Sequence, residues 1–311
     1  MSAKKRQVEN GDAAVATREG GARSTRLLVF GIVIVLLLGG SSYLAWQEVG
    51  PHVLAGSQYQ LDVDQIRVSP APPAWVHSDV KGETLRHAQV DGPLSLLDRE
   101  LTVKLAAAFS AHPWVSKVER VSKHYPAGVD VVLVYRKPAA MVEVQDGAGG
   151  LPVDGEGVLL PTKDFSVEDA QTYPRISEIH SSPSGTIGAS WGDPCVTGAA
   201  QVAAAIAADW RALGLFRIVP DERRPARSGV EYTFALVTNS GTKIHWGRAP
   251  GPHLRGEVAA AEKISQLKRY AAQNRGSLDD PEGQPHEITI SSAGALLSSP
   301  RPRIEPLPKS D

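Results

Sequence analysis

The sequence predicts an α+β protein that one helix near the N-terminus anchors in a membrane. Three observations support this prediction. A long apolar run lies near the N-terminus, apolar residues recur elsewhere at the spacing of amphipathic helices, and short alternating segments are separated by turn residues. The chain has 311 residues, and those after the apolar run are enough for one large or two modest domains, of which we expect two.

The apolar run, residues 27–46, contains no charged residue and is predicted to be a transmembrane helix. Such a helix is roughly 30 Å long, which is the thickness of a bilayer's hydrocarbon core. Residues 1–26 are rich in Ala, Gly and charge and predict a disordered cytoplasmic tail. After the run, no Lys or Arg occurs until Arg67, whereas the basic residues before it are Lys4, Lys5, Arg6, Arg18, Arg23 and Arg26. This asymmetry places the N-terminus in the cytoplasm and the bulk of the chain outside it.

A cleaved secretory signal is the alternative interpretation of the apolar run, because it also has a basic segment followed by an apolar core. Three features argue against it. The basic segment is long, the apolar run has the length of a membrane span, and the residues after Leu38 offer no good small-x-small cleavage site.

The composition limits the classes of function. A net charge of -1 and a pI near 6.8 provide no excess of Lys and Arg for a nucleic-acid surface. Cys195 is the single cysteine, so neither an intramolecular disulfide nor a cysteine-based metal site is expected. The nine histidines show no i,i+3 or i,i+4 pair and no H-E-x-x-H motif. We therefore expect no catalytic, metal or cofactor site and no small-molecule substrate, and we expect proteins as partners.

The first folded domain is expected at residues 57–137, with the element order strand, helix, helix, strand, strand. The predicted ranges are 58–70 for the first strand, 79–87 and 97–109 for the helices, and 114–123 and 129–135 for the last strands. Ser78 is the expected N-cap of the first helix. The last strand is apolar almost throughout, as in a strand covered on both faces.

The second of these helices has the clearest pattern in the chain. Its apolar residues recur every four positions and form one stripe of Leu97, Leu101, Leu105 and Phe109. In the next segment Val115, Val118 and Val121 recur every three positions. Since this is not the period of a regular strand, a β-bulge or an irregular start of the strand is expected there.

A mixed β domain with helices is expected at residues 138–296, followed by a proline-rich tail at 297–311. Within it, turn residues around Asp154 and Gly157 predict a hairpin over 151–161. The other predicted elements are a strand at 141–144, helices at 197–213 with Thr197 as N-cap and at 257–273, a hairpin at 232–246, and a final strand at 287–291.

Several short pieces of the chain together point to one known family. They are His112-Pro113-Trp114-Val115, Tyr125-Pro126, Arg136-Lys137-Pro138-Ala139-Ala140 and Val153-Asp154-Gly155-Glu156-Gly157-Val158. With the single anchor, they give a chain that resembles the FtsQ/DivIB family of bacterial cell-division proteins. The resemblance covers the anchor and residues 59–161, whereas the remainder follows the family only in its order of elements.

The resemblance implies that residues 57–137 form a POTRA domain and that strands of the following mixed β domain bind partners. It further implies a non-enzymatic divisome scaffold of the inner membrane, single-pass, with its bulk in the periplasm. The implied partners are bitopic division proteins similar to FtsB and FtsL and the machinery of septal peptidoglycan synthesis.

We place the partner surface on the last helix and strand. Because that strand comes last in the chain, it is expected to leave a sheet edge unpaired, where another protein can add a strand through main-chain hydrogen bonds. The alternative is that this strand is interior to the sheet. The expected partner-binding residues are Tyr270, Glu287, Ile288, Thr289, Ile290 and Ser291.

Two other functions are consistent with parts of the sequence. A membrane-anchored serine hydrolase is indicated by G-x-S-x-G at residues 188–192, with Ser190 as nucleophile, followed by His245, His253 and His286. The segment before Ser190 is not a buried strand, which argues against this function. A POTRA-type secretion or assembly factor is the other alternative, and the single POTRA-like unit argues against it.

The topology can be tested with reporter fusions. A reporter that works only outside the cytoplasm should be active when it is fused after Ser298, because the basic residues before the span stay inside. Fusions of the same reporter to the N-terminus serve as the control and should be inactive. Activity of a strictly cytoplasmic reporter after Ser298 would overturn the assignment.

Overall fold

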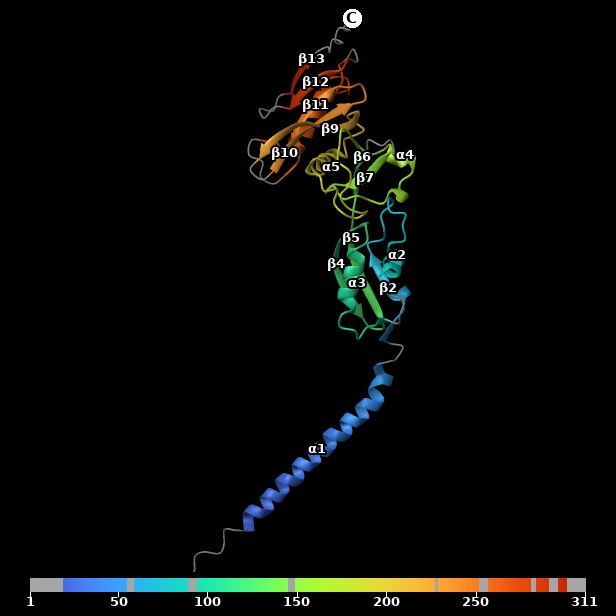
Figure 1. Cartoon of the computed structure of the whole chain (residues 1–311), viewed down its shortest axis with the longest axis vertical. Helices are drawn as coiled ribbons and strands as arrows, with labels where there is room; N and C mark the ends of the chain where they lie inside the picture. Colours follow the sequence, from blue (N-terminus) through green and yellow to red (C-terminus); the bar gives the residue numbers. More distant parts are fainter. Residues whose placement is uncertain are drawn as a thin grey trace, which may run out of the picture.

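The computed structural model describes residues 19–54, 59–88, 94–144, 149–226, 229–251, 257–280, 284–290 and 296–300. It confirms the α+β class, with one N-terminal apolar helix and mixed sheets. Figure 1 shows this helix, α1, extending from the folded part of the chain. The start of the expected cytoplasmic tail, Ser291 and residues 301–311 lie outside the described residues.

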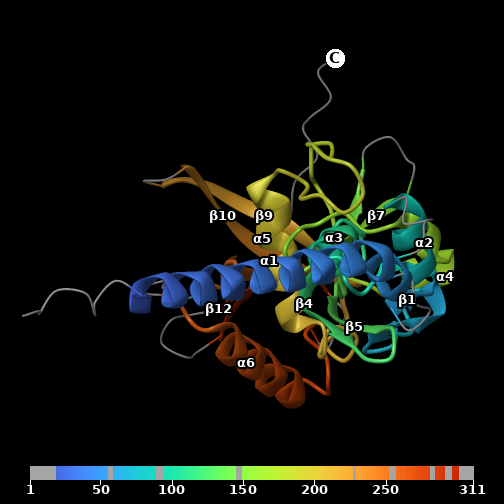
Figure 2. The same cartoon turned by 90° about the horizontal axis from the view of Figure 1, so that it is seen from below.

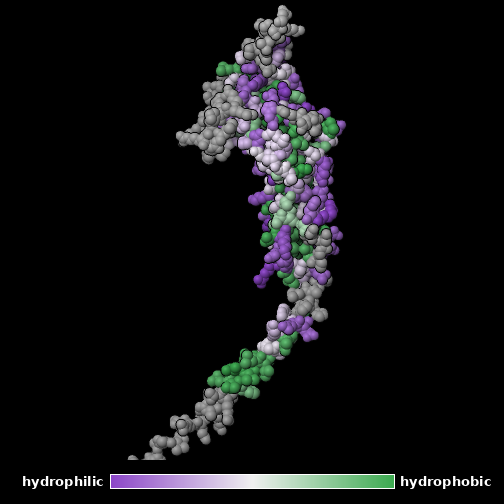
Figure 3. Space-filling model, in the orientation of Figure 1, coloured by the Kyte–Doolittle hydropathy of each residue, from purple (hydrophilic) through white to green (hydrophobic). Residues whose placement is uncertain are grey.

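Helix α1 (Glu19–Leu54) is longer than the apolar run that predicted it. It continues into residues 19–26, which were expected to be disordered, because a helix propagates at little cost once the apolar segment is helical. The part from Leu28 to Val49 is long and apolar enough to cross a membrane, and none of it is buried. Figure 3 shows its apolar side chains gathered on the surface.

A three-stranded sheet follows, in the order β2-β5-β4. Strand β5 (Gly128–Tyr135) lies between β2 (Ile66–Ser69), to which it is parallel, and β4 (Val115–His124), to which it is antiparallel. Helices α2 (Val80–His87) and α3 (Leu101–Ser110) lie between β2 and β4 in the chain, so the expected order of strand, helix, helix, strand, strand is present. Three smaller elements accompany them: β1 (Gln60–Leu61) and η2 (Val63–Gln65) precede β2, and β3 (Leu94–Ser95) lies between α2 and α3.

Local interactions shift three of the predicted boundaries in this region. A capping box of Asp62 and Gln65 closes η2 and interrupts the strand that was expected to be continuous. Asp79, and not Ser78, caps α2 by accepting a hydrogen bond from the Gly82 amide. Helix α3 starts at Leu101 and omits Leu97, which is 44% exposed.

The cause of the late start of α3 is a turn before it. The Asp98 carboxylate accepts a hydrogen bond from the Glu100 amide at 2.8 Å, and the Asp98 carbonyl accepts one from the Leu101 amide. Such Asx turns compete with helix formation.

The strands of the small sheet test two further expectations. The bulge in β4 is confirmed by register shifts between Val115 and Lys117 and between Val118 and Arg120. The expectation that β5 is covered on both faces is wrong, since Val134 on its second face is 39% exposed. The buried face consists of Val129, Val131 and Leu133.

The larger sheet has eight strands in the order β13-β12-β11-β10-β9-β8-β6-β7. Their bounds are β6 (Pro138–Glu143), β7 (Gly150–Asp154), β8 (Arg175–Ile176), β9 (Leu215–Ala226), β10 (Gly229–Thr238), β11 (Lys243–Arg248), β12 (His286–Ile290) and β13 (Leu296–Pro300). The other elements are η3 (Thr162–Asp164), α4 (Val167–Ala170), α5 (Pro194–Ile206) and α6 (Ala260–Gln273). In Figure 1, β11, β12 and β13 lie at the end of the molecule farthest from α1.

Several predictions for this region hold, and others need correction. The turn at Asp154 and Gly157 and the hairpin of β10 and β11 are confirmed. Helix α5 begins earlier than predicted, because Asp193 caps it and Pro194 occupies its first turn, where a missing N–H costs nothing. Thr197 is therefore not the cap, and its hydroxyl donates to the Asp193 carbonyl.

Three strands of the larger sheet were not expected. Strand β8 is too short to show a pattern, and β9 contains the polar sequence of residues 221–226 with prolines at 220 and 225. Strand β13 covers the start of the segment that was expected to be a proline-rich tail from residue 297 onward.

The described residues form two large hydrophobic clusters. The first cluster comprises Leu61, Ile66, Val76, Val80, Leu85, Leu101, Leu105, Phe109, Trp114, Val115, Val129, Val131, Leu133 and Leu160. The second packs α5 and α6 against the larger sheet, with Phe234, Trp191 and Trp246 among its largest members. Leu160 belongs to the first cluster although it follows β7 in the chain.

The stripe of α3 provides a stability test. Leu105 is 1% exposed, so Leu105→Ala should lower the free energy of unfolding by about 2–5 kcal/mol through lost burial and a residual cavity. Val103 on the same helix is 68% exposed, so Val103→Ala is the matched control and should change stability by less than about 0.5 kcal/mol. Urea denaturation followed by tryptophan fluorescence measures both, and equal effects of the two substitutions would contradict the packing.

Candidate functional site

The described residues among those expected to bind partners come together at one end of the larger sheet. Figure 2 shows α6, which carries Tyr270, beside β12. The Tyr270 hydroxyl lies 3.2 Å from Nε2 of His286. Ile288 is fully buried and Ile290 packs against the second cluster, whereas Thr289 is exposed. These residues therefore form one region of the surface. The side chain of Thr289 can contact a partner there, whereas that of Ile288 cannot.

The expectation that this last predicted strand is a sheet edge is wrong. Strand β12 pairs in parallel with β11, where His245 lies opposite Thr289, and antiparallel with β13, where Leu297 lies opposite Thr289. Both sides of its backbone are thus occupied. The chain turns back after β12 and supplies the next strand itself, so β13 ends the sheet in the described part of the chain.

Glu287 belongs to a polar cluster on the face of the sheet. Asp221 accepts hydrogen bonds from Lys243 Nζ and from His245 Nδ1, each at 2.6 Å, and His245 Nε2 lies 3.5 Å from Glu287. Burial raises the pKa of Asp221, but the hydrogen bonds from Lys243 and His245 outweigh this effect, and the pKa lies below its usual value. Within the described ranges, no group of three acidic, His or Cys side chains is arranged to hold a metal ion.

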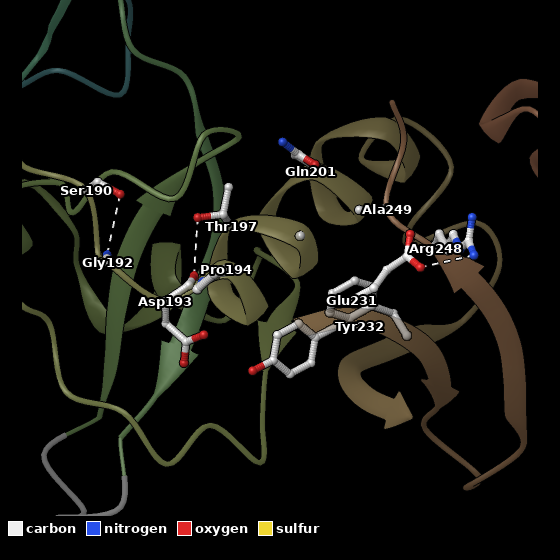
Figure 4. A pocket seen from close by; sticks show the side chains of 12 residues that line it. Ser190, Gly192, Asp193, Pro194, Thr197, Gln201, Glu231, Tyr232, Arg248 and Ala249 are labelled. Atoms are coloured by element: carbon white, nitrogen blue, oxygen red, sulfur yellow. Dashed lines mark hydrogen bonds and ion pairs between the residues drawn. The ribbon is translucent and has the colours of Figure 1, made fainter. Parts of the chain in front are cut away.

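Ser190 lines a separate pocket of about 470 Å³ between the start of α5 and β10 (Figure 4). The Gly192 amide lies 3.4 Å from the Ser190 hydroxyl. The backbone of Ser190 pairs with that of Val158 in a single antiparallel β-bridge. The described lining residues are Ser190, Gly192, Asp193, Pro194, Thr197, Gly198, Gln201, Glu231, Tyr232, Phe234, Arg248 and Ala249. This set does not include a histidine that could act as a base for Ser190.

The histidines considered as partners of Ser190 have other contacts. His245 lies between Asp221 and Glu287, and buried His286 contacts Tyr270 and Thr242. His253 lies outside the described residues. The absence of enzymatic activity stays a prediction.

Sequence reasoning missed a further group of polar residues, at the junction between the two sheets. Asp164 in η3 is 7% exposed, and its Oδ2 accepts hydrogen bonds from Trp114 Nε1 and from the Ser78 hydroxyl, each at 2.5 Å. The Asp164 carbonyl lies 3.0 Å from His77 Nδ1. This one residue thus contacts the segments before α2 and after α3, and it holds residues 160–165 on the first cluster.

Two motif residues that carried the family resemblance meet at the same junction. Arg136 Nη1 lies 2.6 Å from Asp154 Oδ2, and both side chains are largely buried. The other Asp154 oxygen accepts hydrogen bonds from the Glu156 and Val158 amides, which fixes the turn. Asp164 itself lies in no motif, and its short 3₁₀ helix gives no sequence pattern that could have identified it.

Comparisons of this chain with protein-family models and with curated proteins gave no match.

The junction yields a second stability test. Asp164→Ala leaves the buried Trp114 indole N–H without its acceptor and removes the acceptor of the half-buried Ser78 hydroxyl. It should cost about 1–3 kcal/mol, the cost of one stranded buried donor. Asp64→Ala is the control, because this acidic residue is exposed in η2 and should change stability little. Chemical denaturation compares the two, and a loss below about 0.5 kcal/mol for Asp164→Ala would contradict the central role of this carboxylate.

Proposed function

We propose that this chain is a membrane-anchored, non-enzymatic scaffold of the bacterial divisome, of the FtsQ/DivIB type. It binds bitopic division proteins similar to FtsB and FtsL on the periplasmic side of the inner membrane, and it helps to control septal peptidoglycan synthesis. The observation that carries the proposal is the small sheet. Its β2-β5-β4 order, with two helices between β2 and β4, supports a POTRA-like domain next to the apolar helix.

The larger sheet supports the binding part of the proposal. The last strand of its described part, β13, pairs with β12 on one side and with no described strand on the other, which leaves that side for strand addition by a partner. The exposed Thr289 and half-buried Glu287 flank this strand. We therefore move the proposed main-chain contact from β12 to β13 and keep the α6 and β12 residues as its side-chain surroundings.

Localisation tests the proposed function. A fluorescent fusion of the full chain should concentrate at division sites, and depletion of the protein should yield filamentous cells. A fusion of residues 1–56 alone is the control and should stay distributed around the envelope, because the proposed contacts lie in the folded part. An even distribution of the full chain, with normal division after depletion, would refute the proposal.

A pair of adjacent proline substitutions tests the docking strand. Since N–H groups of consecutive residues in a strand point to opposite sides, one of the Leu297 and Ser298 amides faces β12 and the other faces outward. Proline at the outward position should weaken partner binding by about 3–10-fold, the value of one hydrogen bond, with unchanged circular dichroism. Proline at the other position should loosen β13 itself. If both variants stay folded and bind the FtsB- or FtsL-like partner with wild-type affinity, β13 is not the docking strand.

A further inference from the structure

We infer that His112 is a proton-sensitive latch, which in its neutral form holds residues 160–165 against the first hydrophobic cluster and in its protonated form releases them. The inference rests on the contacts of this imidazole and does not depend on the proposed function.

His112 lies where α3 ends and is 6% exposed. It lines a cavity of about 450 Å³ that α2 and α3 share with residues 161–163 and Ile187. The cavity therefore lies between the first cluster and the segment that packs on it. Thr84, whose buried hydroxyl has no hydrogen-bond partner in the described part of the chain, also lines it.

The two ring nitrogens of His112 require a neutral imidazole. Nδ1 accepts a hydrogen bond from the Trp114 amide at 3.3 Å, and Nε2 lies 3.3 Å from the Glu83 carboxylate. Both contacts are satisfied when the proton is on Nε2 and Nδ1 is an acceptor. A second proton must go to Nδ1, where it faces the Trp114 N–H. Two donors then oppose each other, and the hydrogen bond to the Trp114 amide is lost.

The charges around His112 do not prevent this effect. The groups that face it are Glu83 and His87 from α2 and Lys163 and Asp164 from η3. The negative charge of Glu83 favours the protonated ring. The same carboxylate also forms an ion pair with Lys163, whose Nζ lies 2.8 Å from Glu83 Oε1. Burial of the ring outweighs the attraction of Glu83, so the pKa of His112 lies below its usual value.

Trp114 transmits the change to the junction. Its amide contacts His112, and its indole N–H donates to Asp164, which holds residues 160–165. Loss of the bond to the amide therefore acts on the residue that anchors Asp164. The neighbouring cavity provides space for the imidazolium to move and for water to solvate it.

The pH window follows from proton linkage. In the open state His112 regains a pKa near 6.5, whereas in the closed state its pKa is lower, so the open state binds more protons. Above about pH 6.5 the stability of the closed state is fully present. It decreases as the pH falls below about 6.5, until the pH is below the pKa of His112 in the closed state.

Hydrogen exchange of the full chain in detergent micelles tests the latch. After correction for intrinsic rates, peptides that cover residues 110–116 and 158–166 should exchange faster at pH 5 than at pH 7.5, by up to about 30-fold, the limit that an open-state pKa near 6.5 sets. A peptide from α5 is the internal control and should not change. Equal protection of the junction at both pH values would overturn the inference.

Two matched histidine variants assign the effect. His112→Asn keeps an acceptor near the Trp114 amide and cannot titrate, so its junction should show no pH response. His87→Asn removes the other histidine of the cavity and should keep the wild-type response. A response that persists in His112→Asn, or that disappears in His87→Asn, would overturn the inference.

Lys163 provides a test that does not require His112 to be replaced. Its side chain is 60% exposed, and it lowers the pKa of His112 in the closed state. Lys163→Met should therefore bring that pKa closer to the pKa of the open state and reduce the ratio of the exchange rates at pH 5 and pH 7.5. Lys104→Met is the control, since the Lys104 side chain is 58% exposed and pairs with Asp98 and Glu100. A ratio in Lys163→Met that equals or exceeds the wild-type ratio would contradict the latch.

Discussion

The burial of one carboxylate, Asp164, determines how the two folded parts of this chain are joined. A buried charge is costly unless hydrogen-bond donors surround it, and here Trp114 and Ser78 provide them. Both donors belong to the first part of the chain, whereas Asp164 follows β7. The hydrogen bonds of this carboxylate form only when the two parts are in contact. They therefore stabilise the contact and also favour one relative position of the two parts.

The edges of the sheets decide where another chain can pair with this one. Strand β4 is an edge of the small sheet, and it carries two bulges and exposed charged residues, including Lys117 and Arg120. Such features discourage strand addition. Strand β13 lacks charged residues, so it offers an edge that is more accessible than that of β4. In Figure 1 this edge lies far from α1.

Much of the fold was predictable where local patterns and tertiary packing agree. The stripe on α3, the bulge in β4 and the hairpin of β10 and β11 all come from apolar spacing or turn residues that act within one segment. Strand β9 was missed because its second half is polar and is held by pairing with β10. Of the candidate sites, the sequence indicated the region of α6 and β12, where partner binding stays a prediction. It gave no indication of the junction around Asp164.

The sequence alone determined that the chain has an apolar helix of membrane-spanning length, an α+β fold and a strand, helix, helix, strand, strand order in its first part. These features depend on the hydrophobicity and periodicity of consecutive residues. Only the tertiary structure decided that β12 is an interior strand and that Asp164, Trp114 and His112 form one connected network. The physical reason is that strand pairing and buried polar contacts join residues that are far apart in the chain. The spacing of apolar residues within one segment contains no information about such contacts.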